Sequence, residues 1–431
     1  MNRKKILILN IISVFLVLSG CQSDSNNTDS DSKKPSVTIS WWGGESRNDA
    51  TIAAVKQFEQ LNDVEINIEY GAWSGWETRM AARIYSDSMS DVMQINQNWI
   101  TMYESSDRQR FYDLGELSDI IDFSQYSEES IERCSYEGEI KAVPVSLTSK
   151  LFYFNENTFR KAGIDVPETL DELYAAGETF RDVLGDDYYP LSLGEYDRMI
   201  LMVYYLESVY GREWITNKKL NYSKDEIIQG LKFISSLEDR HVIPDVKKLS
   251  GDGALSLDKN VNWITGKYAG IFEWDSTISK FIDSVDEQQH ICLGGYLNGM
   301  GSYDGGFSKI SLAFAISENT KYPELCARLI NFLLNEEEGV KLMGVQRGVP
   351  LSSKARQICT DNNLIDEMTM DANTQIMERT KFIVDPYFEY TCLKSENGGV
   401  YFDVMSGLSY GDYTVSEAAE KLIKGIDEVL Q

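Results

Sequence analysis

The stretch that most constrains the fold is residues 140–155, IKAVPVSLTSKLFYFN, where an interrupted strand pattern runs directly into an aromatic one. Pro144 lacks the amide hydrogen that a central strand needs, so this part fits an edge or crossing segment. The apolar run that ends at Asn155 is typical of a buried strand. We therefore expect the chain to pass here from one lobe to a second, with a ligand cleft between them.

The size and charge of the chain support two domains and exclude some partners. Its 431 residues exceed what one ordinary core holds. Hydrophobic residues at 42% and charged residues at 25% are ordinary for a globular protein. The net charge of -27, from 68 acidic and 41 basic residues, repels nucleic acid and anionic lipid. We expect no nucleic-acid partner.

The first twenty residues fit a signal peptide. Three basic residues at positions 3 to 5 precede a mostly apolar run, residues 6–18, which is too short to span a bilayer as an ordinary helix. The run ends in LSGC, which resembles the lipobox of bacterial lipoproteins and implies cleavage before Cys21 and lipid on its sulfur. Residues 22–35 have no apolar face to bury and are expected to form a flexible tether.

The cysteines and histidines give no metal or redox pattern. After Cys21 the chain has an odd number of cysteines at irregular spacings, with no CxxC. The sequence allows one disulfide among them and does not decide which cysteines would form it. His241 and His290 are isolated, so we expect no metal and no cofactor. The remaining cysteines, read as small buried apolar residues, are Cys134, Cys292, Cys326, Cys359 and Cys392.

Strand and helix patterns alternate in the first quarter of the chain. Residues 37–42 and 64–70 fit strands, and residues 48–61 between them have apolar positions at helical spacing. A further strand pattern at residues 91–95 follows a second helical stretch, so this part is an α/β lobe. The strand ends carry WGGES and NQNW, and ligands collect at the carboxyl ends of strands in such sheets.

Later segments predict helices and two more crossings between lobes. A helix is expected from Pro323, and residues 308–317 and 347–350 fit the second and third crossings. Three helix starts show the capping box, in which a hydroxyl and a glutamate three residues on satisfy each other's amides. These pairs are Thr169 with Glu172, Ser223 with Glu226, and Thr414 with Glu417.

An ordered series of segments resembles one known family. The series includes VTISWWGGE, INIEYGAW, SDVMQIN, KAVPVSL followed by LFYFNENTFRKAGI, WITGKYAGIFEWD, LINFLLNEEEGVK and QRGVPLS. In this order the segments are similar to the extracellular solute-binding proteins of ABC sugar importers, the family related to maltodextrin-binding protein. The similarity runs from about Val37 to the C-terminus.

The resemblance implies an α/β fold of the type II periplasmic-binding-protein class, with two lobes, three crossings and a cleft between the lobes that closes like a hinge. It implies no catalysis, a monomer, and delivery of a captured carbohydrate to ABC permease subunits. It places the protein on the outer face of a Gram-positive cytoplasmic membrane, held only by the lipid on Cys21. The expected segments are a signal peptide (1–20), a lipidated tether (21–35), a first lobe (36–143 and 309–350) and a second lobe (144–308 and 351–431).

Candidate ligand residues follow from sugar chemistry and from the resemblance. Amides and carboxylates pair with sugar hydroxyls, and flat aromatic rings cover the apolar faces of sugar rings. Trp274 and Asp275 match the point where relatives present a stacking tryptophan and a polar residue. Of Trp73 and Trp76, one is expected in the cleft and the other in the core. The expected set is Glu45, Trp73, Asn96, Trp99, Tyr153, Asn155, Trp274, Asp275, Tyr303 and Lys309.

Two other functional classes stay open at this point. A surface glycoside hydrolase needs a carboxylate pair at a set separation, and 68 acidic residues supply such pairs by chance. A binding protein for peptide, polyamine or metal is the second alternative, and the net charge disfavours an anionic ligand. Aromatics at several strand ends predict an oligosaccharide of two or more units, while the sugar's identity, linkage and chain length stay open.

Overall fold

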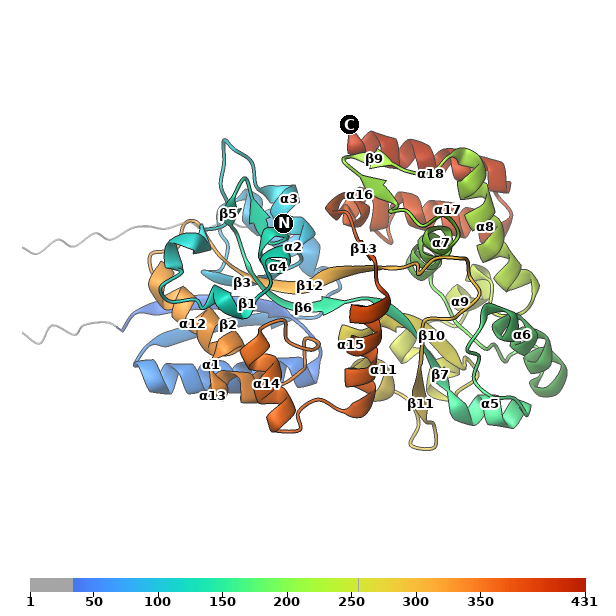
Figure 1. Cartoon of the computed structure of the whole chain (residues 1–431), viewed down its shortest axis with the longest axis horizontal. Coiled ribbons are helices and arrows are strands. Elements are labelled where there is room, and N and C mark those ends of the chain that lie inside the picture. Colours follow the sequence, from blue (N-terminus) through green and yellow to red (C-terminus); the bar gives the residue numbers. More distant parts are fainter. Residues whose placement is uncertain (1–33, 255) are drawn as a thin grey trace, which may run out of the picture. The chain divides into compact units, whose positions relative to one another are not determined.

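The computed structural model describes residues 34–254 and 256–431. Residues 35–431 form one compact unit, in which strands and helices alternate along the chain (Figure 1). The signal peptide, Cys21 and most of the expected tether lie outside the described residues. Within the described part of the chain, no helix is long and apolar enough to cross a membrane.

A six-stranded sheet organises the first hydrophobic core. Its strand order is β13-β12-β3-β1-β2, and β6 also pairs with β12. β1 runs parallel to β2 and β3, whereas β12 is antiparallel to β3 and β6. The strands are β1 (Ser36–Trp42), β2 (Glu65–Gly71), β3 (Val92–Ile95), β6 (Val143–Thr148), β12 (Phe307–Ile316) and β13 (Phe382–Ile383).

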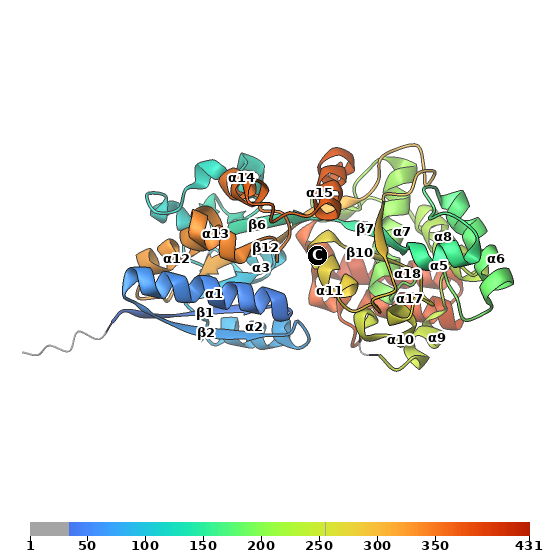
Figure 2. The same ribbon diagram turned by 90° about the horizontal axis from the view of Figure 1, so that it is seen from below.

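Helices cover both faces of this sheet, with α1, α12 and α13 on one face and α2 and α3 on the other (Figures 1 and 2). α1 buries Ala54, Val55 and Phe58, which join the core formed by the sheet. The helices of this part are α1 (Glu45–Asn62), α2 (Trp76–Tyr85), α3 (Asn98–Tyr103), α4 (Glu128–Glu132), α12 (Pro323–Asn335), α13 (Glu337–Met343) and α14 (Ser353–Asp361). A short hairpin of β4 (Ser135–Tyr136) and β5 (Glu139–Ile140) lies beside them.

A second, three-stranded sheet organises the other part. Its antiparallel order is β10 (Gly270–Trp274), β7 (Lys150–Asn155) and β11 (Ile291–Gly295). A small hairpin joins β8 (Ile215–Thr216) to β9 (Lys219–Leu220). The helices here are α5 (Glu156–Ala162), α6 (Leu170–Leu184), α7 (Glu195–Tyr210), α8 (Lys224–Asp239), α9 (Val246–Gly251), α10 (Val261–Ile264), α11 (Ile278–Ile282), α15 (Glu367–Arg379), α16 (Thr391–Lys394), α17 (Val400–Tyr410) and α18 (Val415–Leu430).

The predicted helix starts are confirmed where local chemistry decides them. All three expected capping boxes are present, at the starts of α6, α8 and α18. Pro323 occupies the first turn of α12, where its missing amide hydrogen costs nothing. The helix expected over residues 48–61 begins earlier, at Glu45, because the chain leaves its extended conformation directly after Gly44.

Two long segments pass from one hydrophobic core to the other. In β12, Phe307 packs in the second core, whereas residues from Ile310 onward pack in the first. Val145 of β6 belongs to the first core, and Phe152 of β7 belongs to the second. The two-lobe α/β architecture expected from the sequence is therefore confirmed.

The segment after residue 350 returns first to the six-stranded part. α14 packs against α13, with Ala355 and Cys359 beside Val340 in a small apolar cluster. A lobe boundary at residue 350 thus separates α14 from the helices that it contacts. The chain reaches the second part again only at α15, where Ala372 and Ile376 pack with residues of β7 and β10.

Candidate ligand-binding site

Tryptophan side chains gather where β1 ends and α2 begins. The ring centroid of Trp42 lies 5.0 Å from that of Trp73, 5.7 Å from Trp99 and 6.4 Å from Trp76. Trp42, Trp76 and Trp99 are buried, whereas Trp73 is 41% exposed. Trp73 is therefore the member of this group whose ring a ligand can reach, and the other rings support it.

Trp274 stands at the end of β10, in the second part of the molecule, and is partly buried. The Lys309 Nζ lies 4.3 Å from the centroid of its ring, and the Lys150 Nζ lies 5.5 Å away. Phe307 packs beside it with centroids 6.4 Å apart. The structure thus brings together Trp274 and Lys309, two of the residues expected from the sequence.

A line of charged groups connects Trp274 to Trp73. Lys309 forms an ion pair with Glu389, whose side chain is nearly buried. Lys394, near Glu389, has its Nζ 5.7 Å from the centroid of the Trp73 ring. Burial alone would raise the pKa of Glu389, but the charges of Lys309 and Lys394 outweigh it and lower that pKa to about 2. Glu389 is therefore an ionised, fixed anion between the two tryptophans.

Asp275 is buried, and nearby donors engage its carboxylate. Thr148 Oγ1 donates to Asp275 Oδ1 at 2.5 Å, and the backbone amide of Ser149 donates to the same oxygen at 3.2 Å. Burial raises the pKa of Asp275 to about 6, although these hydrogen bonds act in the opposite direction. Asp275 thus ties the segment after β10 to the junction of β6 and β7.

The remaining expected residues are dispersed. Asn155 is buried at the far end of β7 from Lys150, roughly 16 Å away at strand rise, and its side chain caps α5. Tyr153 is buried in a cluster with Trp263, and Asn96 is buried after β3. Glu45 is exposed in the first turn of α1. None of these joins the line between Trp73 and Trp274.

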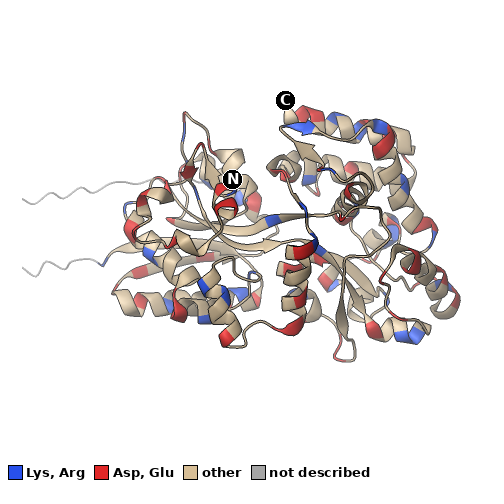
Figure 3. Cartoon of the chain, in the orientation of Figure 1, with Lys and Arg blue, Asp and Glu red and all other residues tan. Residues whose placement is uncertain are grey.

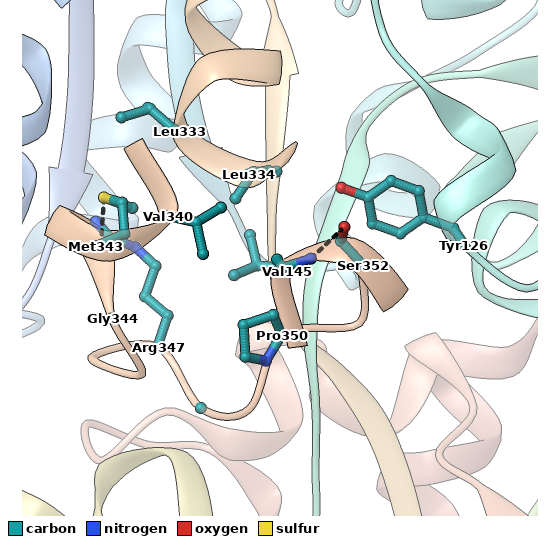
Figure 4. Close-up of a pocket in the computed structure, with 12 residues that line it drawn as sticks. Tyr126, Val145, Leu333, Leu334, Val340, Met343, Gly344, Arg347, Pro350 and Ser352 are labelled. Carbon is teal, nitrogen blue, oxygen red and sulfur yellow. Dashed lines mark hydrogen bonds between the residues drawn. The ribbon is translucent and has the colours of Figure 1, made fainter. Parts of the chain in front are cut away.

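Tyr303 lies elsewhere, at a hollow of about 170 Å³ under the glycine-rich loop that precedes β12. Its lining includes Tyr204, Tyr296 and Arg379. A smaller hollow of about 20 Å³ lies under the segment that follows α13, between Leu334, Val340, Pro350 and other side chains (Figure 4). Trp73 and Trp274 line neither of these two hollows, and the candidate site is the surface that runs from Trp73 to Trp274.

Several contacts join the two parts near this surface. Basic residues lie along β12 and near β13, which run between the two parts (Figure 3). Acidic residues are spread over both parts. The joining contacts include Arg47 Nη2 to the Ser276 carbonyl (3.5 Å), Asn98 Nδ2 to the Glu389 carbonyl (3.1 Å) and Lys394 Nζ to Glu77 Oε1 (3.8 Å). Sequence reasoning missed Arg47, Glu389 and Lys394, because no local pattern marks them.

Residues 44–340 match the family model of the bacterial extracellular solute-binding protein. The match covers more than half of the chain. The protein belongs to this family.

Solved relatives of this solute-binding protein extend over nearly its whole length. A periplasmic oligogalacturonide-binding protein from Yersinia enterocolitica, in complex with saturated digalacturonic acid, is 32% identical with a TM-score of 0.87, covering 92% of this chain and 99% of that one. A periplasmic solute-binding protein from Pectobacterium atrosepticum is 31% identical with a TM-score of 0.85, covering 92% and 98%. The resemblance drawn from the sequence is confirmed.

A curated relative matches over a shorter stretch. The multiple sugar-binding protein of Streptococcus mutans is 27% identical over 233 residues, 52% of this solute-binding protein. The chain therefore spans about half the length of that relative, 53%.

The described residues of the solute-binding protein contain no group of three or more His, Cys, Asp or Glu side chains that could hold a metal ion. Its cysteines between residues 134 and 392 are all free thiols.

The burial of the tryptophans predicts different effects of truncation. Trp99→Ala removes a fully buried ring and should lower the free energy of unfolding by about 3 to 5 kcal/mol. Trp73→Ala removes a ring that is already partly in water and should cost under about 1.5 kcal/mol. Urea unfolding of both variants without ligand measures this, and equal losses would show that Trp73 is also a core residue.

Proposed function

We propose that this solute-binding protein captures a carbohydrate, an oligosaccharide of two or more units, between its lobes. The observation that carries the proposal is the pair of accessible rings, Trp73 and Trp274, joined by the charged groups of Lys309, Glu389 and Lys394. Flat rings suit the apolar faces of sugars, and fixed charged groups suit their hydroxyls. The Yersinia relative binds a galacturonic acid disaccharide and the Streptococcus relative is a multiple sugar-binding protein, which supports this class of ligand.

The expected ligand residues differ in their roles in this proposal. Trp73, Trp274 and Lys309 contact the sugar, since each is exposed or borders the candidate surface. Asp275 binds Thr148 and Trp99 packs against Trp42, and these contacts hold that surface in place. The other expected residues lie away from the line between Trp73 and Trp274, and they are Glu45, Asn96, Tyr153, Asn155 and Tyr303.

We assign the lobes from the packing of the two cores. The first lobe holds residues 36–143 and 309–350 together with α14, and the second holds residues 144–308 and the part of residues 351–431 that follows α14. Val145 of the crossing strand β6 is still packed in the first core. Because α14 packs against α13, we move the third crossing beyond Asp361, so that α14 stays with the first lobe. Closure of the lobes around a ligand needs only these three connections to flex.

The ligand is bound and released without chemical change, and the protein delivers it to ABC permease subunits whose energy comes from a separate ATPase. The family consists of binding proteins, which supports this. A surface glycoside hydrolase is the alternative that an experiment must exclude. No cofactor has a role in the proposal, and the protein acts as a monomer.

Titration with oligosaccharides tests this function. Calorimetry with a matched series should show tighter binding for two or more units than for the monosaccharide, and chromatography should recover the sugar unaltered. Trp274→Ala should weaken binding by roughly 2 kcal/mol or more, at least about thirtyfold, because it removes a stacking face. Product formation would mean an enzyme, and unchanged affinity in the variant would move the stacking role to Trp73.

We also propose that Cys21, which lies outside the described residues, carries the lipid that anchors the protein. The motif LSGC at residues 18–21 supports a diacylglycerol thioether with an acylated amino group, palmitate being a typical chain, on the outer face of a Gram-positive membrane. The family description, an extracellular protein, agrees with that side of the membrane.

Cys21→Ala tests the anchor directly. The variant should appear in the medium or as an unprocessed precursor, because the sulfur that takes the lipid is gone. Fractionation of cells followed by detection of the protein measures this. Normal processing and membrane retention of the variant would contradict the anchor.

A further inference from the structure

Two arginines near the candidate site lack a counter-ion. Arg47 lies in the first turn of α1, and Arg347 lies in the segment after α13. Within residues 34–254 and 256–431, neither guanidinium contacts a carboxylate. Arg47 donates to the carbonyls of Gln346 and Ser276, and its Nη1 makes no hydrogen bond to a described residue.

Arg347 is enclosed more completely. Its Nε donates to Gln94 Oε1 and its Nη1 to Thr51 Oγ1, both at 2.9 Å, while Nη2 is buried without a partner. Figure 4 shows its side chain running from the segment before Pro350 toward Met343. All of these partners are neutral. The positive charge of Arg347 is therefore not balanced where it lies.

The two guanidinium groups also repel each other. Burial lowers the pKa of Arg47 to about 10. Burial lowers the pKa of Arg347 well below its ordinary value, and the charge of Arg47 lowers it further. Desolvated charges of one sign cost free energy unless an opposite charge is near. An anion next to Arg47 would relieve both the desolvation and the repulsion.

The lysines close to the tryptophans differ from these arginines in this respect. Lys150 pairs with Asp197, Lys309 with Glu389, and Lys394 lies 3.8 Å from Glu77. Their charges are balanced by the protein itself. The unbalanced charge lies instead where Arg47 reaches the Ser276 carbonyl, two residues after Trp274 along the chain. The unbalanced charge of Arg47 therefore lies against the segment that follows Trp274.

We infer that the ligand is an acidic oligosaccharide and that Arg47 binds a uronate carboxylate, with Arg347 adding its charge from behind. This inference rests on the proposed function and names the substrate class of the same site. A guanidinium presents parallel N–H groups that match a carboxylate, which a neutral sugar hydroxyl does not. The net charge of -27 opposes the approach of an anion, but it is screened over about 8 Å at physiological ionic strength.

The test compares one disaccharide with and without its charge. Digalacturonic acid and its dimethyl ester are titrated into wild type, Arg47→Gln, Arg47→Lys and Arg160→Gln. Arg160→Gln is a matched control, because this substitution removes the same charge from a site on α5 where the side chain is 72% exposed. Unfolding of each ligand-free variant shows that it is folded.

Wild type should bind the acid at least about tenfold tighter than the ester, because a contact between a carboxylate and a desolvated arginine changes the affinity by about that factor. Arg47→Gln should remove this preference and bring the ratio of acid to ester affinity close to one, whatever the change in affinity for the ester. Arg47→Lys should keep part of the preference, and Arg160→Gln should keep all of it. If Arg47 only holds the lobes together, its loss would weaken acid and ester equally and leave their ratio unchanged.

Three outcomes would overturn the inference. They are equal binding of acid and ester by wild type, an unchanged ratio in Arg47→Gln, and binding of neutral oligosaccharides with no binding of the acid. In the last case the proposed function survives and only the substrate class fails. If no carbohydrate binds at all, the proposed function fails together with this inference.

Discussion

The rest of the structure depends on the ladder between β6 and β12. These antiparallel strands pair from Lys309 with Thr148 to Phe314 with Val143, and Ala313 also pairs with Ile95 of β3. Buried backbone groups need such partners, so the ladder fixes both strands as they leave the first core. The sequence PVSL around Pro144 is tolerated because the register shifts twice along this pairing.

This ladder also positions the candidate site. Thr148, paired with Lys309, is the last residue of β6 and binds Asp275, while Lys309 begins the part of β12 that pairs with β6 and reaches Trp274. Trp274 and Asp275 are thus held by contacts with strands that continue into the first part. A change in the angle between the lobes would therefore alter the surface between Trp73 and Trp274 without breaking either core.

Local chemistry could be predicted from the sequence, and long-range contacts could not. The strands near residues 37–42 and 64–70, the capping boxes and the start of α12 depend on neighbours a few residues away. Asn155, a predicted ligand residue, caps α5 in the structure, and an amide directly before a helix start is a typical cap. Glu389 was not predictable, because its partner Lys309 is 80 residues distant. The burial of Trp99 was not predictable either, because it depends on packing against residues such as Trp42, which is distant in sequence.

The central claim is that the two lobes close on a carbohydrate. Small-angle X-ray scattering of the chain from residue 34 onward measures this directly. The chain is compared with and without a saturating oligosaccharide whose binding has been established by calorimetry. The account predicts a smaller radius of gyration in the bound state, because hinge closure brings the two cores together. An unchanged radius of gyration at confirmed saturation would contradict capture by closure.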